Sequence, residues 1–291
     1  MPVPWSHLIR FKAQEDGLIY LGQVDSQVVP DVGVAVFTGR KVSARVVSGT
    51  VFEGKVTDAL LSPLSIDQVP VILCLGLNYR DYAKESNMPI PDEPVLFLKP
   101  HRSLTGPSPQ KVSIPGIAQD GSSDYEGELG FFLSRTGRDI AERDAWDYVL
   151  GFTCCNDISA RNLQFKSSQW SFSKGFDTST PTGPTLVSPG ALSDPHNLRI
   201  RTIYNKDYTV QDSSTRELIF SVPYIISYLS QGTTLEKGTL VPTGTPPGIG
   251  CMRQPKVVLG DGDEVRVAIE NIGILISQVS YSDANSKEVR G

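Results

Sequence analysis

The sequence predicts an α+β fold rich in β-strands, with a small β-rich domain over residues 1–65 and a larger domain over residues 66–291. Short strand-like runs separated by turn residues fill the first part of the chain. A fully apolar run at residues 71–76 is typical of a buried strand, and runs with helical spacing are few and short. The length of 291 residues suits one large domain with a small one.

Three runs in the first domain, at residues 8–12, 17–21 and 32–37, are expected to be strands. Asp, Gly and Lys separate them, as in turns between strands. Residues 62–70, with a proline near each end, are the expected join to the larger domain.

The larger domain opens with the buried strand at residues 71–76, and a helix is expected at residues 81–85. Pro89, Pro91 and Pro94 end that helix, because proline removes a backbone donor and restricts the preceding residue. An irregular loop beside the end of a buried strand is a usual place for an active-site lid.

The rest of the chain alternates between such elements and one long irregular stretch. Residues 158–184 show no periodic run and many Ser, Thr, Gly and Pro, which favours a functional loop. The other expected elements are a capping-box start at residues 139–142, a short helix over 145–150 ending at Gly151, a hairpin over 198–210, an amphipathic helix over 218–229 and a strand over 265–270.

Composition argues against several classes of partner and location. The net charge is −5 and no basic run exceeds two residues, which argues against nucleic acid or an anionic membrane as partner. No apolar run approaches the roughly 20 residues of a membrane span. The first residues resemble neither a signal peptide nor a transit peptide, so we expect a cytoplasmic protein.

The cysteines and histidines offer little reactive chemistry. Cys74, Cys154, Cys155 and Cys251 form no CxxC pair and no zinc-like spacing, so we expect reduced thiols that fill the core. The adjacent pair would face opposite sides of a strand. With only three histidines, chemistry that needs several of them is excluded.

Three carboxylates form the most informative pattern. If residues 124–130 are a strand, Glu126 and Glu128 point the same way, with Gly127 between them. Asp157 follows another apolar run, at residues 151–155. An all-oxygen set suits a hard cation such as Mg²⁺. Two solvent-facing glutamates on a half-exposed strand would give the same spacing, so the neighbourhood must decide.

Polar or glycine-rich islands at the ends of other apolar runs supply that neighbourhood. On its own, Lys174 is more typical of a solvated lysine than of a site residue, and Arg161 is typical of either a surface charge or an anion clamp. Residues 243–250 lack the Lys-Ser/Thr pair and following helix of a phosphate loop, which favours a turn.

Taken together and in order, these islands resemble the fumarylacetoacetate hydrolase superfamily over about residues 71–278, closest to its subgroup that includes oxaloacetate tautomerases. The matching pieces lie at residues 75–79, 94–100, 124–129, 151–161, 174–184 and 243–248. The resemblance implies a β-rich roll of mixed sheets with a few short helices, a homodimer, and Mg²⁺ or Mn²⁺ as cofactor. It also implies substrates with adjacent or alternating carbonyl groups.

The resemblance assigns roles residue by residue. It implies Glu126, Glu128 and Asp157 as metal ligands. It implies that the substrate is held or polarised by Arg161, Gln164, Lys174 and Thr245. The catalytic set would be Tyr82, Glu85 and Lys174.

Two positions depart from the family pattern. Where the family carries a His followed three residues later by a Glu, this chain has Tyr82 and Glu85. In hydrolytic members that His–Glu pair activates water, whereas a tyrosine with an ordinary pKa near 10 is no base at neutral pH. Asn162 stands where the family usually has Asp. His101, in the loop after residue 100, is the remaining candidate base.

We therefore expect an enolising tautomerase or isomerase that acts on a 2-oxo acid or β-dicarbonyl compound, with Tyr82 as proton donor and Glu85 orienting it. Tautomerisation, decarboxylation and C–C hydrolysis share an enolate, but only hydrolysis strictly needs an activated water. A C–C hydrolase or decarboxylase is the alternative, and a non-catalytic metal- or ligand-binding relative the second. Specificity is expected to lie in residues 86–93 and 158–172.

Overall fold

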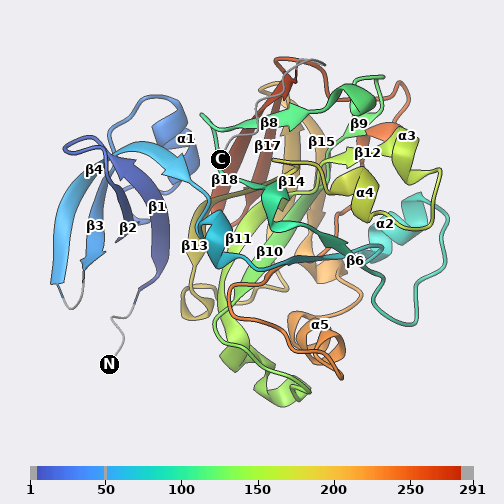
Figure 1. The fold of residues 1–291 in the computed structure, drawn as a ribbon, viewed down its shortest axis with the longest axis horizontal. Coiled ribbons are helices and arrows are strands. Elements are labelled where there is room, and N and C mark those ends of the chain that lie inside the picture. The colour runs from blue at the N-terminus through green and yellow to red at the C-terminus, as the bar shows by residue number, and fades with distance from the viewer. Residues whose placement is uncertain (1–4, 49–50, 283–291) are drawn as a thin grey trace.

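The computed structural model describes residues 5–48 and 51–282, and the described chain is dominated by β-sheet (Figure 1). Three sheets are present in these residues, of eleven, five and two strands. Five α-helices lie in the described part of the chain, and all are short, as predicted. Their bounds are α1 Val32–Phe37, α2 Arg80–Glu85, α3 Arg161–Gln164, α4 Ser171–Lys174 and α5 Val222–Leu229.

The large sheet runs in the order β2-β3-β4-β1-β13-β11-β10-β16-β5-β6, and β7 pairs with β13 beside this path. Its strands are β1 His7–Ala13, β2 Ile19–Gln23, β3 Ser43–Ser48, β4 Val51–Leu61, β5 Ile72–Leu75, β6 Leu96–Lys99, β7 Leu104–Thr105, β10 Gly127–Leu133, β11 Val149–Asn156, β13 Thr180–Val187 and β16 Leu240–Pro242.

The five-stranded sheet, in the order β15-β14-β17-β18-β8, packs against the large one through β13, β10 and β11. Its strands are β8 Lys111–Ile114, β14 Arg199–Tyr204, β15 Tyr208–Ser214, β17 Glu264–Ile269 and β18 Gly273–Tyr281, and the two-stranded sheet pairs β9 Ser123–Asp124 with β12 Ser159–Ala160. Short 3₁₀ segments lie at Ile66–Gln68, His101–Ser103, Gly116–Ala118, Glu142–Tyr148, Pro189–Ala191, Thr215–Glu217 and Gly250–Met252.

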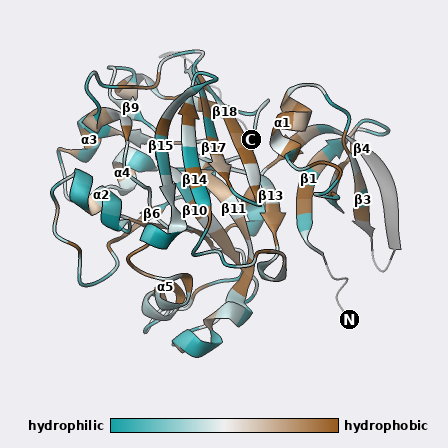
Figure 2. Cartoon of the chain, turned by 180° about the vertical axis from the view of Figure 1, so that it is seen from behind, coloured by the Kyte–Doolittle hydropathy of each residue, from teal (hydrophilic) through white to brown (hydrophobic). Residues whose placement is uncertain are grey.

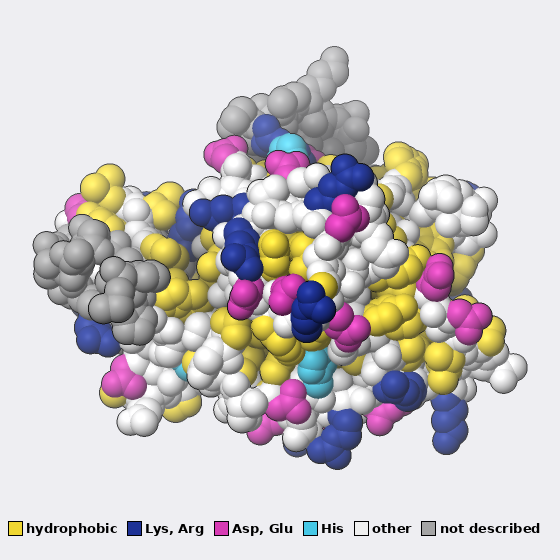
Figure 3. All heavy atoms as spheres, turned by 90° about the horizontal axis from the view of Figure 1, so that it is seen from below, with side chains coloured by type: hydrophobic (Ala, Val, Ile, Leu, Met, Phe, Trp, Pro, Cys, Tyr) yellow, Lys and Arg dark blue, Asp and Glu magenta, His cyan; other side chains and the backbone are white. Residues whose placement is uncertain are grey.

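The main hydrophobic core lies where these sheets meet, and helix α5 packs over one end of it beside Glu142–Tyr148. Hydropathy follows this arrangement: the central strands are largely apolar and α2 is polar (Figure 2). On the face seen from below, hydrophobic side chains gather in patches among scattered charges (Figure 3). Within the part of the chain that the structure describes, no helix is long and apolar enough to cross a membrane.

The N-terminal strands form a lobe with α1 that has its own cluster of buried side chains (Figure 1). The lobe is continuous with the large sheet, because His7 and Leu8 of β1 pair with Val187 and Leu186 of β13. The domain boundary at residues 65 and 66 stays a prediction.

The expected strand at residues 32–37 is wrong, because these residues form helix α1. The Asp31 carboxylate caps the helix by accepting the Val34 N–H at 2.9 Å. Gly33 packs so tightly that an added Cβ would lie 2.0 Å from the Ile274 carbonyl oxygen. Capping and this contact with β18 override the strand preference of the valines.

The expected helix over residues 145–150 is also wrong in type and extent. The segment forms the 3₁₀ turn Glu142–Tyr148, and β11 begins at Val149. Asp139 accepts the Gly232 N–H instead of starting a helix. Gly151 lies inside β11, where an added Cβ would lie 2.7 Å from the Val187 carbonyl oxygen, so this glycine permits close strand packing rather than ending a helix.

Residues 158–184, expected as one irregular loop, contain two short helices and the buried start of β13. The Thr- and Pro-rich composition of β13 conceals a strand, and two of its partners, β1 and β7, are distant in sequence. The other expectations hold: β1, β2 and β5 form, α2 forms at residues 80–85, the hairpin is β14–β15, α5 lies within its expected run, and β17 matches its expected run to within one residue at each end.

Candidate metal centre and active site

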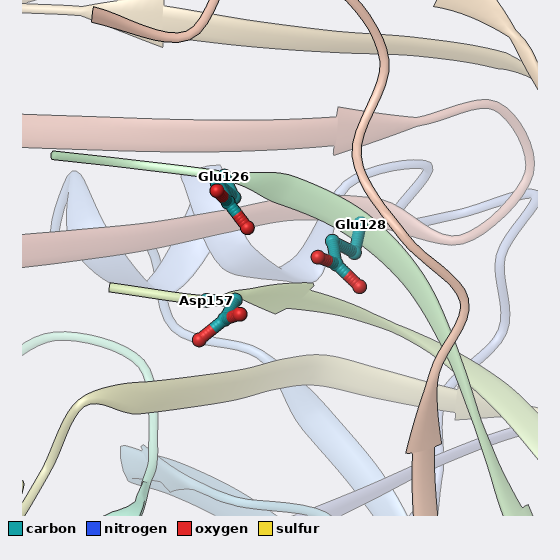
Figure 4. Close-up of side chains that lie close together, drawn as sticks. All are labelled: Glu126, Glu128 and Asp157. Atoms are coloured by element: carbon teal, nitrogen blue, oxygen red, sulfur yellow. The ribbon is translucent and has the colours of Figure 1, made fainter. Parts of the chain in front are cut away.

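The three predicted carboxylates converge on one point. One ligand oxygen from each of Glu126, Glu128 and Asp157 lies within 4.8 Å of the others, and all three residues are buried (Figure 4). Antiparallel pairing of β10 with β11 sets Gly127 opposite Asn156 and so brings the carboxylates together.

The backbone at this point departs from the expected continuous strand. β9 ends at Asp124 and β10 begins at Gly127, which leaves Glu126 between them. The Asn156 side chain accepts the Glu126 N–H at 3.0 Å, and the Glu126 carbonyl accepts the Asp157 N–H at 2.8 Å. These bonds hold Glu126 in place where the regular ladder stops, and it still faces the same way as Glu128.

Glu128 is the carboxylate that most needs a cation. Its Oε2 accepts the Gly244 N–H at 2.8 Å, while its Oε1 is buried without a hydrogen-bond partner among the described residues. Burial, and then the charges of Asp157 and Glu126, raise its pKa well above the ordinary value. An orphaned carboxylate oxygen within an all-oxygen set fits a hard divalent cation.

Glycine and asparagine shape the loop that donates to Glu128. Gly244 has a φ of 95°, and an added Cβ would lie 3.0 Å from both the Asn78 Cβ and the Gly76 carbonyl oxygen. The Asn78 side chain donates to the Thr243 carbonyl at 2.7 Å and accepts the Phe220 N–H at 2.8 Å. Asn78 thus ties three segments behind the carboxylates, a role that its sequence neighbours do not reveal.

Two buried lysines balance the acidic charge. Lys174 Nζ donates to Glu126 Oε2 at 2.8 Å, to Asp157 Oδ2 at 2.8 Å and to Ser159 Oγ at 2.6 Å. Lys99 Nζ donates to Asp157 Oδ1 at 2.6 Å and to the Ser179 carbonyl at 2.9 Å. Lys174 is therefore no solvated surface lysine.

These lysines set the charge state of Asp157. Burial alone would raise its pKa, but the ammonium groups of Lys174 and Lys99 outweigh burial, so the pKa lies below the ordinary value. Burial would lower the pKa of Lys174, but Asp157 and Glu126 raise it instead. Both groups are charged at neutral pH.

Lys99 was assigned no role from the sequence. A signal existed: in the run 96–99 it alternates with exposed Leu96 and Leu98 and shares the buried face of β6 with Phe97. A lysine at an inward position requires a buried counter-charge.

Arg161 is buried and already partly paired. Its Nε donates to Asp124 Oδ2 at 2.9 Å, and its Nη1 lies 2.6 Å from Glu126 Oε1 and 2.7 Å from Gln164 Oε1. Its Nη2 is buried with no hydrogen-bond partner among the described residues. Asp124, to which the sequence analysis gave no role, fixes the guanidinium and leaves one donor for a ligand.

These groups meet at a cavity of about 370 Å³. Of the predicted site residues, those that line it are Tyr82, Glu126, Arg161, Gln164, Lys174 and Thr245. The Thr245 hydroxyl already has two hydrogen bonds within the protein: it donates to the Gly127 carbonyl at 3.1 Å and accepts from the Gln211 side chain at 2.8 Å. Substrate binding by Thr245 and Gln164 stays a prediction.

Tyr82 lies in the cavity wall on α2. Burial, and then the charge of Glu126, raise its pKa above the ordinary value, so the phenol keeps its proton. The expected pairing with Glu85 does not form among the described contacts: Glu85 Oε2 accepts the Gly248 N–H at 3.0 Å. In the structure, Glu85 fixes the glycine loop rather than orienting Tyr82.

The remaining candidates lie outside the cavity. His101 is exposed and is not among its lining residues. Asn162 donates to Asp120 on the surface side of α3. Cys74, Cys154 and Cys155 are buried free thiols as predicted, and Cys251 is half-buried in the cavity wall with its pKa raised by burial to about 11.

Comparison with known proteins identifies this arrangement. The family model described as fumarylacetoacetate (FAA) hydrolase C-terminal matches residues 71–280. Oxaloacetate tautomerase fahd2 of Xenopus laevis, described as mitochondrial, is 42% identical over 223 residues, which cover 76% of this chain and 68% of the relative. Caffeoylpyruvate hydrolase of Neonothopanus nambi is 39% identical over 293 residues, covering 94% and 93%.

Solved structures agree on the fold. The 2-hydroxyhepta-2,4-diene-1,7-dioate isomerase of Mycobacterium marinum superposes with a TM-score of 0.77 at 30% identity, covering 95% of this chain and 99% of that one. The fumarylacetoacetate hydrolase of psychrophilic Exiguobacterium antarcticum has a TM-score of 0.77 at 32% identity, covering 95% and 100%. The resemblance read from the sequence is confirmed: the chain belongs to the fumarylacetoacetate hydrolase family of enzymes.

Proposed function

We propose that this protein is a divalent-metal-dependent tautomerase or isomerase that acts on the enol and keto forms of a 2-oxo acid or β-dicarbonyl compound. The observation that carries the proposal is the buried carboxylate triad, beside Lys174 and Arg161, at a cavity whose wall offers a neutral phenol. No histidine among the described residues lines that cavity.

Mg²⁺ or Mn²⁺ is the proposed cofactor, held by Glu126, Glu128 and Asp157. The all-oxygen donor set and the orphaned Glu128 Oε1 support this choice. When bound, such a cation would act as a Lewis acid toward the oxygens of a 2-oxo acid.

The chain's own residues would handle charge and protons. Arg161 Nη2 would bind the substrate carboxylate, and Lys174 Nζ would stabilise negative charge on the adjacent oxygen. In ketonisation the enol O–H bond breaks and a C3–H bond forms. Tyr82 would give its proton to C3 and recover one from the enol oxygen.

C–C hydrolysis is the second candidate. The match to caffeoylpyruvate hydrolase over nearly the whole of both chains favours it. Hydrolysis requires a group that activates water. Tyr82 keeps its proton and Glu85 accepts the Gly248 N–H, so neither is suited to that task. Decarboxylation shares the enolate and stays an alternative. A non-catalytic relative is disfavoured because all three ligands and both site cations are present.

An oxaloacetate assay tests the proposal. Enol decay is followed by ultraviolet absorbance and carbon products by NMR, with Mg²⁺ and with a chelator. We expect metal-dependent enol decay without new carbon products. Metal-dependent pyruvate would support decarboxylation instead, and cleavage of acetylpyruvate into acetate and pyruvate would support hydrolysis.

We further propose a homodimer in the cytoplasm that uses neither nucleic acid nor membrane as a partner. The net charge of −5 supports the last two points. Light scattering on the purified protein would measure its mass, and a monomeric mass at micromolar concentration would contradict the dimer. Fractionation of the source cells would test the compartment, since the Xenopus laevis relative is described as mitochondrial.

A further inference from the structure

The residues around the cavity divide by chemistry and burial. Glu126, Arg161 and Lys174 line it, are charged and are buried; together with Glu128 and Asp157, which complete the carboxylate triad, they are here called the floor. An apolar and more exposed part of the lining is here called the rim. The rim residues are Leu77, Met88, Phe165, Trp170 and Met252.

The rim is assembled from four separate parts of the chain. Leu77 follows β5, Met88 lies between α2 and β6, Phe165 and Trp170 lie between α3 and α4, and Met252 ends the turn Gly250–Met252. Two of these stretches, residues 86–93 and 158–172, are the loops in which the sequence predicts specificity.

The rim exposes large apolar side chains to solvent. Phe165 is 74% exposed and Met88 is 54% exposed. A single exposed apolar side chain is ordinary, but several around one concave site mark a surface that a ligand covers. Methionine adapts its shape, and Trp170 is steadied by edge-on contact with Phe97 at 5.6 Å, so the rim combines a fixed wall with adjustable ones.

The distribution of charge in the cavity lining further restricts the chemistry of the ligand. Arg161 and Lys174 are the only Lys, Arg or His side chains among the described residues that line the cavity, and both lie at the floor. A second carboxylate placed at the rim would lose water without gaining a cationic partner, which is unfavourable.

We propose that the rim binds a bulky apolar substituent, aryl or branched alkyl, of a substrate whose 2-oxo acid head lies at the floor. The proposal rests on the proposed function for the head and adds the substrate class. It predicts tighter binding of such a substrate than of a small dicarboxylate such as oxaloacetate, which offers the head group without an apolar substituent. Binding is favoured because the rim covers apolar surface of the substituent, and each methylene that it covers strengthens binding.

Unreactive head-group mimics test the rim without requiring turnover. Oxamate and its N-methyl, N-propyl, N-isobutyl and N-benzyl derivatives keep the carboxylate and adjacent carbonyl and vary only the substituent. Calorimetric titration of the full chain with excess Mg²⁺ gives each Kd. We expect Kd to fall by about fourfold for each added methylene. N-oxalylglycine, which matches N-isobutyl oxamate in size but ends in a carboxylate, should bind more weakly than that derivative.

Matched variants locate the effect. Met88→Ser and Phe165→Ser should flatten the series while leaving oxamate binding unchanged. Ile90→Ser and Phe172→Ser are the controls, because these side chains are 54% and 65% exposed but do not line the cavity. All four positions are exposed, so the fold should tolerate serine.

The outcomes separate the two proposals. A Kd that is independent of the substituent, or tighter binding of N-oxalylglycine, overturns the apolar rim. A steep series in a protein that fails to tautomerise any 2-oxo acid supports the rim and overturns only the proposed reaction. Failure of oxamate itself to bind overturns both.

Discussion

The floor and the rim of the cavity differ in burial and in how firmly their side chains are held. Glu126, Asp157 and Lys174 at the floor are at most 7% exposed and hold one another by hydrogen bonds of 2.8 Å. Met88 and Phe165 at the rim are more than half exposed and lie on connecting segments. The difference teaches that the charged groups are held by buried partners that fix their positions, whereas the side chains proposed to set selectivity are exposed and can be replaced at little cost in folding stability.

Removing a floor ligand should have the largest effect. Asp157→Asn should lower kcat/KM by about 1000-fold, because the cation's contribution of several kcal/mol depends on its ligands. It also leaves the buried Lys99 without a counter-charge and Lys174 with Glu126 alone, which costs roughly 3–5 kcal/mol of folding stability.

Manganese titration by electron paramagnetic resonance and chemical denaturation would measure both effects of Asp157→Asn. Asp177→Asn, at an exposed carboxylate three residues after Lys174, is the control. If Asp157→Asn bound Mn²⁺ like the wild type, the floor would not be the metal centre.

The two buried lysines should differ in kind. Lys174 lines the cavity and Lys99 does not. Lys174→Met should lower kcat by about 100-fold, since it removes a positive charge that would stabilise the developing negative charge, and should leave metal affinity equal or higher. Lys99→Met should mainly reduce the free energy of unfolding, by roughly 3–5 kcal/mol, because it breaks a buried pair.

Steady-state kinetics and urea denaturation on both lysine variants would separate these roles. Lys166→Met controls for loss of an exposed charge nearby. Equal losses of kcat in the two variants would mean that Lys174 acts only by holding Asp157 in place.

Tyr82 lines the cavity and is not one of the three carboxylates, so its removal should affect turnover alone. Tyr82→Phe should lower kcat by about 100-fold with unchanged Mn²⁺ affinity, because a proton donor is lost and no ligand is. Since burial and Glu126 raise its pKa, wild-type kcat should show no loss from tyrosine ionisation below about pH 10.

The control for Tyr82 is Tyr79→Phe, since the Tyr79 hydroxyl is buried and has no hydrogen-bond partner among the described residues. Unchanged turnover in Tyr82→Phe would remove the phenol from the mechanism and bring the hydrolase proposal forward.

The same contrast explains what could be predicted from the sequence. Glu126 and Glu128 were found because period-two spacing is a local signal, and Asp157 because it directly follows an apolar run. The partner of Glu85 was missed because Gly248 lies 163 residues away, and no local pattern encodes such a contact. Helix α1 was read as a strand because valines favour strands, while its packing partner, β18, comes more than 230 residues later.

The smallest predicted effect concerns the charge balance within the floor itself. Glu126 and Asp157 are paired with lysine, but Glu128 has one orphaned oxygen and a raised pKa, chiefly through burial. Without metal, the unfolded chain releases the Glu128 proton near pH 4.3 while the folded chain still holds it. The contribution of Glu128 to the free energy of unfolding is therefore fully present below that pH, and it is lost as the pH rises toward the pKa of Glu128 in the folded protein.

Glu128→Gln removes this penalty, keeps an acceptor for the Gly244 N–H, and should make the metal-free protein about 1–2 kcal/mol more stable at pH 7.5 but not at pH 4. Urea denaturation in chelator across this range measures it, with exposed Glu236→Gln as the control. In excess Mg²⁺ the order should reverse, because only the wild type gains binding energy on folding. A variant no more stable than wild type in chelator would mean that the Glu128 charge is balanced within the protein, and that the floor is a closed set of ion pairs rather than a site short of one cation.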